Sequence, residues 1–147
     1  DGTDTLIGGA GADRLDGGPS TDTASYADST LGLTLDLLTP ALSTGDAAGD
    51  TLVGIERIVL TNLADKFYGS DGNDRAEGLA GNDRLEGGAG ADHLAGRAGS
   101  DSLYGGDGED TLLGGAGADR LEGGLGRDLA SYAEGAGAER ADLPTPS

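Results

Sequence analysis

Aspartate recurs at a fixed interval of nine residues along most of this chain of 147 residues. The interval runs without a break from Asp65 to Asp128, and Asp4, Asp13 and Asp22 keep it near the start. Glycines precede these aspartates, except Asp65, and an apolar residue follows each of them two positions later, as in residues 114–122, which read GGAGADRLE. A period of nine is too short for a helical repeat and lacks the glycine at every third position that collagen requires. The period therefore restricts the chain to short units of turn and strand.

The nine-residue unit predicts an all-β solenoid. Glycine tolerates positive φ, so the glycine-rich part of the unit is expected to be a tight turn. The last three residues of the unit predict a very short strand with one apolar side chain on its inner face. Such a strand cannot bury its side chain alone, whereas stacked copies can. Two units then close one coil of about 18 residues, and residues that far apart lie above one another.

Composition limits the partners that such a chain can have. Twenty-seven Asp and Glu against nine Lys and Arg give a formal net charge of −18, a balance that repels nucleic acid and anionic membranes. No apolar run approaches the roughly 18 residues of a membrane span. The absence of cysteine excludes disulfides and thiolate zinc sites. High charge with few large apolar residues is typical of disorder, so the chain is expected to need a cationic partner to fold.

Stacking brings the periodic carboxylates together in two rows. Asp74, Asp92, Asp110 and Asp128 are expected along one edge of the solenoid, and Asp65, Asp83, Asp101 and Asp119 along the opposite edge. Neighbours in a row would lie about 4.8 Å apart and repel each other unless a positive charge separates them. Carboxylates and inward-facing carbonyls form an all-oxygen cage that suits Ca²⁺ better than Mg²⁺ or Zn²⁺. We expect several calcium ions to bind, about five to eight.

These units resemble the RTX (repeats-in-toxin) hemolysin-type calcium-binding nonapeptide repeats of secreted bacterial proteins. The resemblance implies a parallel β-roll, a right-handed solenoid, interrupted by a spacer. It divides the chain into N-terminal repeats at 1–25, a spacer at 26–60 whose strands continue the roll, a main array at 61–131 and a flexible tail at 132–147. Because Asp65 lies 43 residues after Asp22, seven more than two coils, a loop near residues 40–50 is expected to absorb the excess.

The resemblance also implies how each ion is held. One turn offers the carbonyls of its second and fourth residues and the carboxylate of its sixth. The turn one coil later offers the carbonyls of its first and third residues and its sixth carboxylate. On the first edge this implies Ser70, Gly72 and Asp74 with Gly87, Ala89 and Asp92; Gly88, Gly90 and Asp92 with Gly105, Asp107 and Asp110; and Gly106, Gly108 and Asp110 with Gly123, Leu125 and Asp128. On the opposite edge it implies Thr61, Leu63 and Asp65 with Gly78, Ala80 and Asp83; Leu79, Gly81 and Asp83 with Gly96, Ala98 and Asp101; and Arg97, Gly99 and Asp101 with Gly114, Ala116 and Asp119.

Two further candidate sites involve the first repeats. Gly2 and Asp4 are expected to meet Gly17, Pro19 and Asp22. Asp13 is a candidate to share a site with the spacer acids Asp46, Asp50 and Glu56.

The functional prediction is a calcium-binding module that folds on binding Ca²⁺ outside the cell, as part of a larger bacterial protein exported by type I secretion. Its other expected partners are cell-surface or parent-protein domains. An alternative is a structural or adhesive scaffold at the cell surface, as a fragment of a surface layer or adhesin. Enzymatic activity is not expected of this chain, because it lacks His-Glu-x-x-His and Gly-x-Ser-x-Gly motifs and His93 is its only histidine. A catalytic domain elsewhere in a parent protein is left open.

Overall fold

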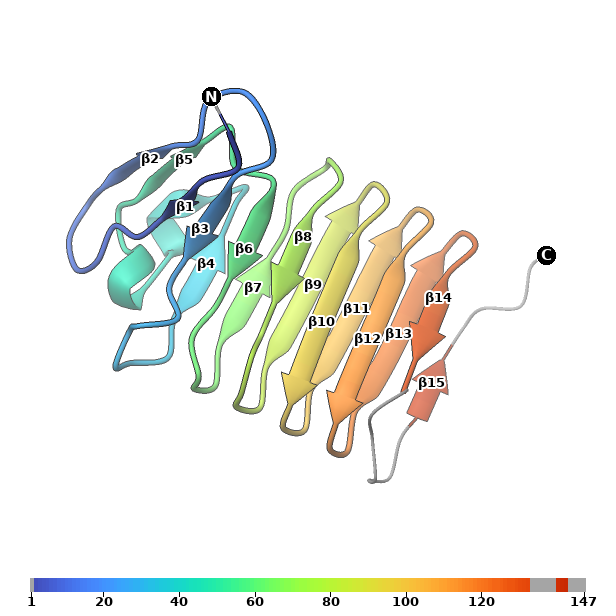
Figure 1. The fold of residues 1–147 in the computed structure, drawn as a ribbon. Coiled ribbons are helices and arrows are strands. Elements are labelled where there is room, and N and C mark those ends of the chain that lie inside the picture. The colour runs from blue at the N-terminus through green and yellow to red at the C-terminus, as the bar shows by residue number, and fades with distance from the viewer. Residues whose placement is uncertain (1, 133–139, 143–147) are drawn as a thin grey trace.

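The nine-residue units fold into short parallel strands joined by glycine-rich turns (Figure 1). A computed structural model describes residues 2–132 and 140–142. The first repeats form β1 (Thr5–Leu6), β2 (Arg14–Asp16) and β3 (Thr23–Ser25). The main array forms β7 (Lys66–Tyr68), β8 (Arg75–Glu77), β9 (Arg84–Ala89), β10 (His93–Ala98), β11 (Ser102–Asp107), β12 (Thr111–Ala116), β13 (Arg120–Leu125) and β14 (Leu129–Ser131). Of the tail predicted at 132–147, Arg140–Asp142 form β15, and residues 133–139 and 143–147 lie outside the described residues.

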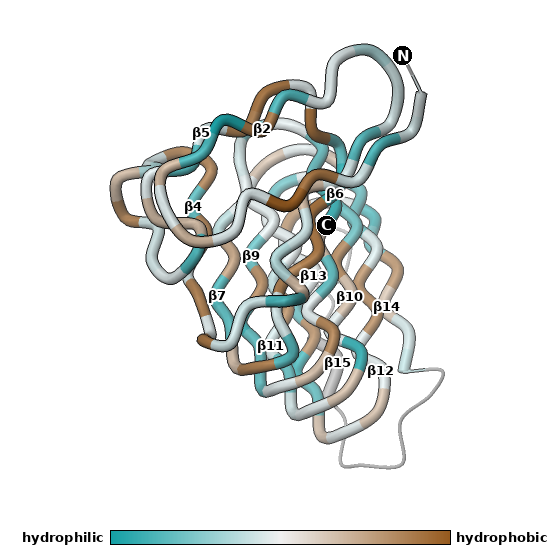
Figure 2. Tube along the Cα trace, turned by 60° about the vertical axis from the view of Figure 1, so that its left-hand side comes forward, coloured by the Kyte–Doolittle hydropathy of each residue, from teal (hydrophilic) through white to brown (hydrophobic). Residues whose placement is uncertain are grey.

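Successive strands alternate between two parallel sheets, so each pair of units makes one coil. One sheet has the order β1-β3-β6-β8-β10-β12-β14, and the other has the order β15-β13-β11-β9-β7-β4. In the second sheet Leu85 pairs with Leu103, and Leu103 with Leu121, which is a register of 18 residues. The predicted all-β solenoid of parallel strands, with about 18 residues per coil, is thus confirmed. In Figure 2 successive coils lie one behind another.

Strands β9 to β13 contain six residues each, twice the predicted length. The additional residues belong to the turns. Gly106 pairs with Gly88 and Asp107 with Ala89, so the first part of each turn continues the ladder of its strand. The backbone of the turns is therefore held by the same stacking that holds the strands.

The core is the narrow space between the two sheets. Each strand contributes one inward side chain, and the inward residues of the main array are almost fully buried: Phe67, Ala76, Leu85, Leu94, Leu103, Leu112 and Leu121. The outward neighbours of these residues carry the charges, as in the exposed ion pairs Arg84–Glu86 and Arg120–Glu122. No helix of the described residues has the length and apolar character needed to cross a membrane.

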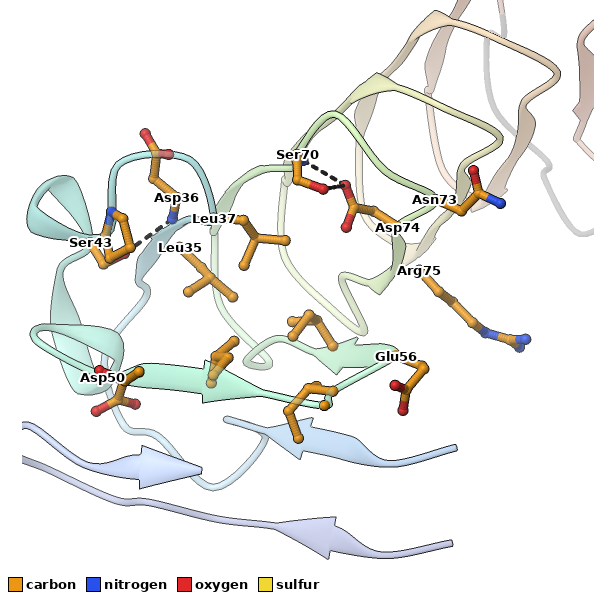
Figure 3. A pocket seen from close by; sticks show the side chains of 16 residues that line it. Leu35, Asp36, Leu37, Ser43, Asp50, Glu56, Ser70, Asn73, Asp74 and Arg75 are labelled. Carbon is orange, nitrogen blue, oxygen red and sulfur yellow. Dashed lines mark hydrogen bonds between the residues drawn. The ribbon is translucent and has the colours of Figure 1, made fainter. Parts of the chain in front are cut away.

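The spacer strands enter both sheets. They are β4 (Thr34–Asp36), β5 (Thr51–Val53) and β6 (Arg57–Val59), with 3₁₀ turns at Pro40–Leu42 and Gly45–Ala47. β4 pairs with β7, and β6 lies between β3 and β8, whereas β5 forms a separate pair with β2. Because β4 and β5 take different partners, the stacking is interrupted here. A cavity of about 340 Å³ opens at this place, lined in part by Leu35, Leu37, Leu52 and Ile55 (Figure 3).

The stacked leucines should supply much of the stability of the calcium-loaded fold. Leu103 is fully buried between Leu85 and Leu121. Truncation to alanine, Leu103→Ala, should lower the free energy of unfolding by about 2–5 kcal/mol, because it leaves a cavity in the ladder. Urea unfolding in saturating Ca²⁺ measures this change.

The matched control is Leu129→Ala, because the Leu129 side chain is 61% exposed. Its effect should stay within about 0.5 kcal/mol. Equal losses for the two variants would contradict the assignment of the core.

Candidate metal sites

The periodic aspartates of the main array lie at the ends of the turns, immediately before the strands, and their side chains point into the molecule. Asp83, Asp92, Asp101, Asp110 and Asp119 are each no more than 3% exposed. Carboxylates are almost never buried to this degree without a partner. The two rows predicted from the sequence precede the strands of the two sheets, one row for each sheet.

One oxygen of each carboxylate stabilises the stack. The backbone N–H of Asp83 donates to Asp101 Oδ1 at 2.9 Å, and that of Asp101 donates to Asp119 Oδ1 at 3.0 Å. In the other row, the N–H of Asp92 donates to Asp110 Oδ1 at 2.9 Å. Each aspartate thus binds the coil before it through Oδ1, and this bond fixes the direction of the second oxygen.

The second oxygen has no partner. Oδ2 of Asp83, Asp92, Asp101, Asp110 and Asp119 is buried without a hydrogen bond among the described residues. An unsatisfied buried oxygen on a charged group costs several kcal/mol. Five such oxygens in register indicate places for a positively charged ligand.

A carbonyl from the next coil converges on this unpartnered oxygen. A methyl carbon built on Gly87 would overlap Asp92 Oδ2 and would lie 2.7 Å from the Gly105 carbonyl oxygen. A methyl carbon on Gly78 would likewise overlap Asp83 Oδ2 and lie 3.0 Å from the Gly96 carbonyl oxygen. The first glycine of these two turns therefore leaves open a cradle lined by oxygens of two coils.

Some of the other implied carbonyl ligands, at the second and third turn positions, already accept a hydrogen bond. The carbonyl at the second turn position is exemplified by Leu79, which accepts from Ala98 N–H at 3.0 Å. The carbonyl at the third position is exemplified by Asp107, which accepts from Gly90 N–H at 2.8 Å. A carbonyl oxygen has two lone pairs, so a cation can use the second one.

In two of these turns, a residue other than glycine adopts the left-handed backbone conformation that glycine has in the others. Leu79 and Arg97 occupy the second position with φ values of 70° and 82°, in the left-handed region that glycine favours. Gly88 and Gly106 have φ values of 109° and 113° at the same position. The two substitutions therefore leave a left-handed turn in place.

Burial shifts the titration of these carboxyls. Desolvation, together with the charges of Asp101 and Asp65, raises the pKa of Asp83 to about 7. Desolvation also raises the pKa of Asp92 and of Asp101 to about 6. In each case the ionised form is disfavoured in the absence of a cation, and a bound cation would reverse that preference.

Two turns of the main array satisfy the second oxygen differently. Asp65 Oδ2 accepts from Thr61 N–H at 2.8 Å and from Thr61 Oγ1 at 2.9 Å. Asp74 Oδ2 accepts from the N–H and the Oγ of Ser70, the latter at 3.0 Å. These caps were not predicted, although a hydroxyl residue four positions before the aspartate is a visible signal in the sequence.

In the first repeats, the spacer supplies the carboxylates that the next coil would otherwise provide. The N–H of Asp13 donates to Asp50 Oδ1 at 2.9 Å, and Asp50 Oδ2 accepts from the Tyr26 hydroxyl. The N–H of Asp22 donates to Glu56 Oε2 at 2.8 Å. Asp50 and Glu56 thus serve different aspartates, so the expected grouping of Asp13 with both of them, and with Asp46, does not form.

No cluster of three or more Asp, Glu or His side chains suited to a metal occurs in the described part of the chain. Any ion held here is therefore bound by carboxylates from two coils together with backbone carbonyls. Such a ligand set consists only of oxygen, which fits a hard cation of flexible coordination such as Ca²⁺.

Comparison with known families identifies the repeat. The family model described as RTX calcium-binding nonapeptide repeat (4 copies) matches residues 1–25, 68–103 and 96–130. No curated protein matches the chain significantly. The matched segments cover more than half of the residues and contain the cradles described above. The chain belongs to the RTX calcium-binding nonapeptide repeat family.

Proposed function

We propose that this chain is a calcium-driven folding module. The observation that carries the proposal is the series of buried Oδ2 atoms without a partner, on Asp83, Asp92, Asp101, Asp110 and Asp119. The repeat is a structural calcium-binding module rather than a catalytic one. Its action is therefore expected to be a change of state of the chain itself.

Four positions fit the ion best, because the unpartnered oxygen and the coil that follows it are both described. Each of them lies between two aspartates that are 18 residues apart in the sequence: Asp83 and Asp101, Asp92 and Asp110, Asp101 and Asp119, and Asp110 and Asp128. The positions that begin at Asp65 and Asp74 fit less well, since Thr61 and Ser70 already satisfy the oxygen that would face the ion. Bound Ca²⁺ supplies positive charge between carboxylates that would otherwise repel each other.

Without calcium, the same fold places ionised oxygens in a dry interior. Each carboxylate then loses its hydration and gains no counter-charge, so the extended chain competes with the coil. Binding free energy thereby becomes folding free energy. Extracellular calcium modules work at about 10⁻⁴–10⁻³ M Ca²⁺, far above cytosolic levels, so a module of this kind is unfolded in the cell and folded outside it.

We place this switch in a larger bacterial protein that leaves the cell by type I secretion. Members of the family are typically secreted, and a chain that stays unfolded until it meets calcium suits passage through a channel. The folded roll is then secreted or held at the cell surface.

Calcium should convert the chain from unfolded to β-structured. In a calcium-stripped buffer at pH 7.5, the far-ultraviolet circular dichroism spectrum should be that of a largely disordered chain. Millimolar CaCl₂ should produce the strand signal cooperatively, and the same concentration of MgCl₂ should not, because Mg²⁺ requires a tighter octahedral shell. A full strand signal in the stripped buffer would refute the switch.

Removing one buried carboxylate should weaken this response. Asp92→Asn removes a charged ligand that lies between two candidate sites. The calcium concentration at the folding midpoint should rise about tenfold or more, since a charged hydrogen-bond or metal partner contributes roughly 1.5–3 kcal/mol.

Asp107→Asn is the matched control. The Asp107 side chain is exposed, and only its backbone carbonyl is implied as a ligand. Its midpoint should stay within about twofold of the wild type. Equal shifts for the two variants would show that net charge, rather than the buried ligand, sets the response.

Acid should stabilise the calcium-free fold. The raised pKa values of Asp83, Asp92 and Asp101, about 7, 6 and 6, mean that the fold binds more protons than the unfolded chain, in which the ordinary value is 3.8. The penalty from these carboxylates is complete above pH 7 and disappears as pH falls toward about 4. The strand signal in calcium-stripped buffer should therefore increase between pH 7.5 and pH 5. An unchanged or smaller signal at pH 5 would contradict the burial of these groups.

A further inference from the structure

Asp22 is completely buried, at the end of the first repeats and beside the spacer. Its Oδ1 accepts the backbone N–H of Asp4 at 2.7 Å, and its own N–H donates to Glu56 Oε2 at 2.8 Å. Its Oδ2 is buried and has no hydrogen-bond partner. Asp22 therefore has the same bonding as Asp92 of the main array, with Glu56 in the place that Asp110 takes there.

The space that Asp22 Oδ2 faces is also built like the cradles of the main array. A methyl carbon on Gly17 would lie 2.7 Å from Asp22 Oδ2 and would overlap the carbonyl oxygen of Gly54. In the main array, a methyl carbon on Gly87 meets Asp92 Oδ2 and the Gly105 carbonyl in the same way. Gly54 comes from the spacer, outside the segments that the family model matches.

The path of the spacer explains this placement. The connection from β5 to β6 is only Gly54, Ile55 and Glu56, whereas the connection between the equally short strands β7 and β8 contains six residues, 69–74. Gly54 adopts a φ of 57°, and a methyl carbon built on it would lie 2.9 Å from the Gly18 carbonyl oxygen. The short connection thus lies directly over the turn that precedes Asp22.

We propose that Asp22, Gly54 and Glu56 form a further cation site of the calcium type, in which the spacer takes the part of the missing coil. Backbone carbonyls of the turn at residues 17–20 complete its oxygen shell. The site rests on the proposed calcium function and extends it to a segment that has no nonapeptide repeat. The ion would add a further link between the β5–β6 connection and the first repeats, beside the hydrogen bond from the Asp22 N–H to Glu56.

Other aspartates at this end of the molecule do not combine full burial, an unpartnered second oxygen and a facing carbonyl from another coil. Asp13 Oδ2 is also buried without a partner, but the residue is only half-buried, and the three atoms nearest to a methyl carbon built on Gly8 all belong to Asp13 itself. The second oxygens of Asp65 and Asp74 are capped by Thr61 and Ser70.

No basic side chain among the described residues forms an ion pair that would neutralise the Asp22 carboxylate in place of a cation. The ion pairs found among the described residues involve Asp16, Glu77, Glu86 and Glu122, and none involves Asp22. The atoms that converge on the space are carboxylate and carbonyl oxygens, which select a hard divalent cation.

Anomalous diffraction tests the site directly. Crystals of the whole chain grown in CaCl₂, with data collected at long wavelength, should show an anomalous peak between Asp22 Oδ2 and the Gly54 carbonyl, in addition to peaks in the main array. Peaks in the main array with none at Asp22 would overturn this inference and leave the proposed function intact. A chain that binds no calcium anywhere would overturn both.

A substitution that removes one carboxylate charge provides an independent count of the bound ions. Native mass spectrometry of Glu56→Gln should show one Ca²⁺ fewer than the wild type at a calcium concentration that just saturates the wild-type chain. Glu109→Gln makes the same change on an exposed side chain of the main array, and should keep the full count. An undiminished count in Glu56→Gln would remove Glu56 from the site.

Discussion

The structure depends on carboxylate oxygens that are buried without a protein partner. Aspartates such as Asp92 use Oδ1 to hold the coil before them and turn Oδ2 toward a space bounded by a carbonyl of the next coil. Desolvation and the neighbouring carboxylates both oppose ionisation at these positions, as the raised pKa values of Asp83 and Asp92 indicate. A fold whose own hydrogen bonds create these places is suited to hold cations in them, as the proposed calcium-driven folding requires.

The nine-residue period serves the core and the ligands together. Two residues after each aspartate, an apolar side chain such as Leu103 enters a ladder between the sheets, and the register that aligns Leu85, Leu103 and Leu121 also aligns Asp83, Asp101 and Asp119. The glycines that allow the tight turn also leave the cradle open, because a methyl group there would occupy the position of a ligand oxygen. Packing and metal binding are therefore coupled, since a slip in register would disrupt both.

Much of this architecture was predictable from the sequence, because period and register are properties of single positions. The solenoid with about 18 residues per coil, the inward leucines and the two rows of aspartates follow from spacing, and the parallel roll was implied by the resemblance to the RTX repeats. The six-residue strands were not predicted, since they arise from pairing between stacked turns such as Gly88 with Gly106. The caps provided by Thr61 and Ser70 were also not predicted, because these residues occupy the second turn position, where the repeat pattern has glycine and no side-chain hydroxyl.

The spacer shows where sequence reasoning ends. Its acids were assigned to Asp13 as one group, but the chain returns through β5 to pair with β2, which places Asp50 beside Asp13 and Glu56 beside Asp22. That path is a tertiary property, set by which strand edge is open, and no local pattern encodes it.

The most direct measurement of calcium-dependent folding is hydrogen–deuterium exchange of the whole chain with and without Ca²⁺. The account predicts that the amides of Asp83, Asp92 and Asp101, which donate to the next carboxylate, are protected only when calcium is bound. Equal protection of these amides in the calcium-free chain would contradict it.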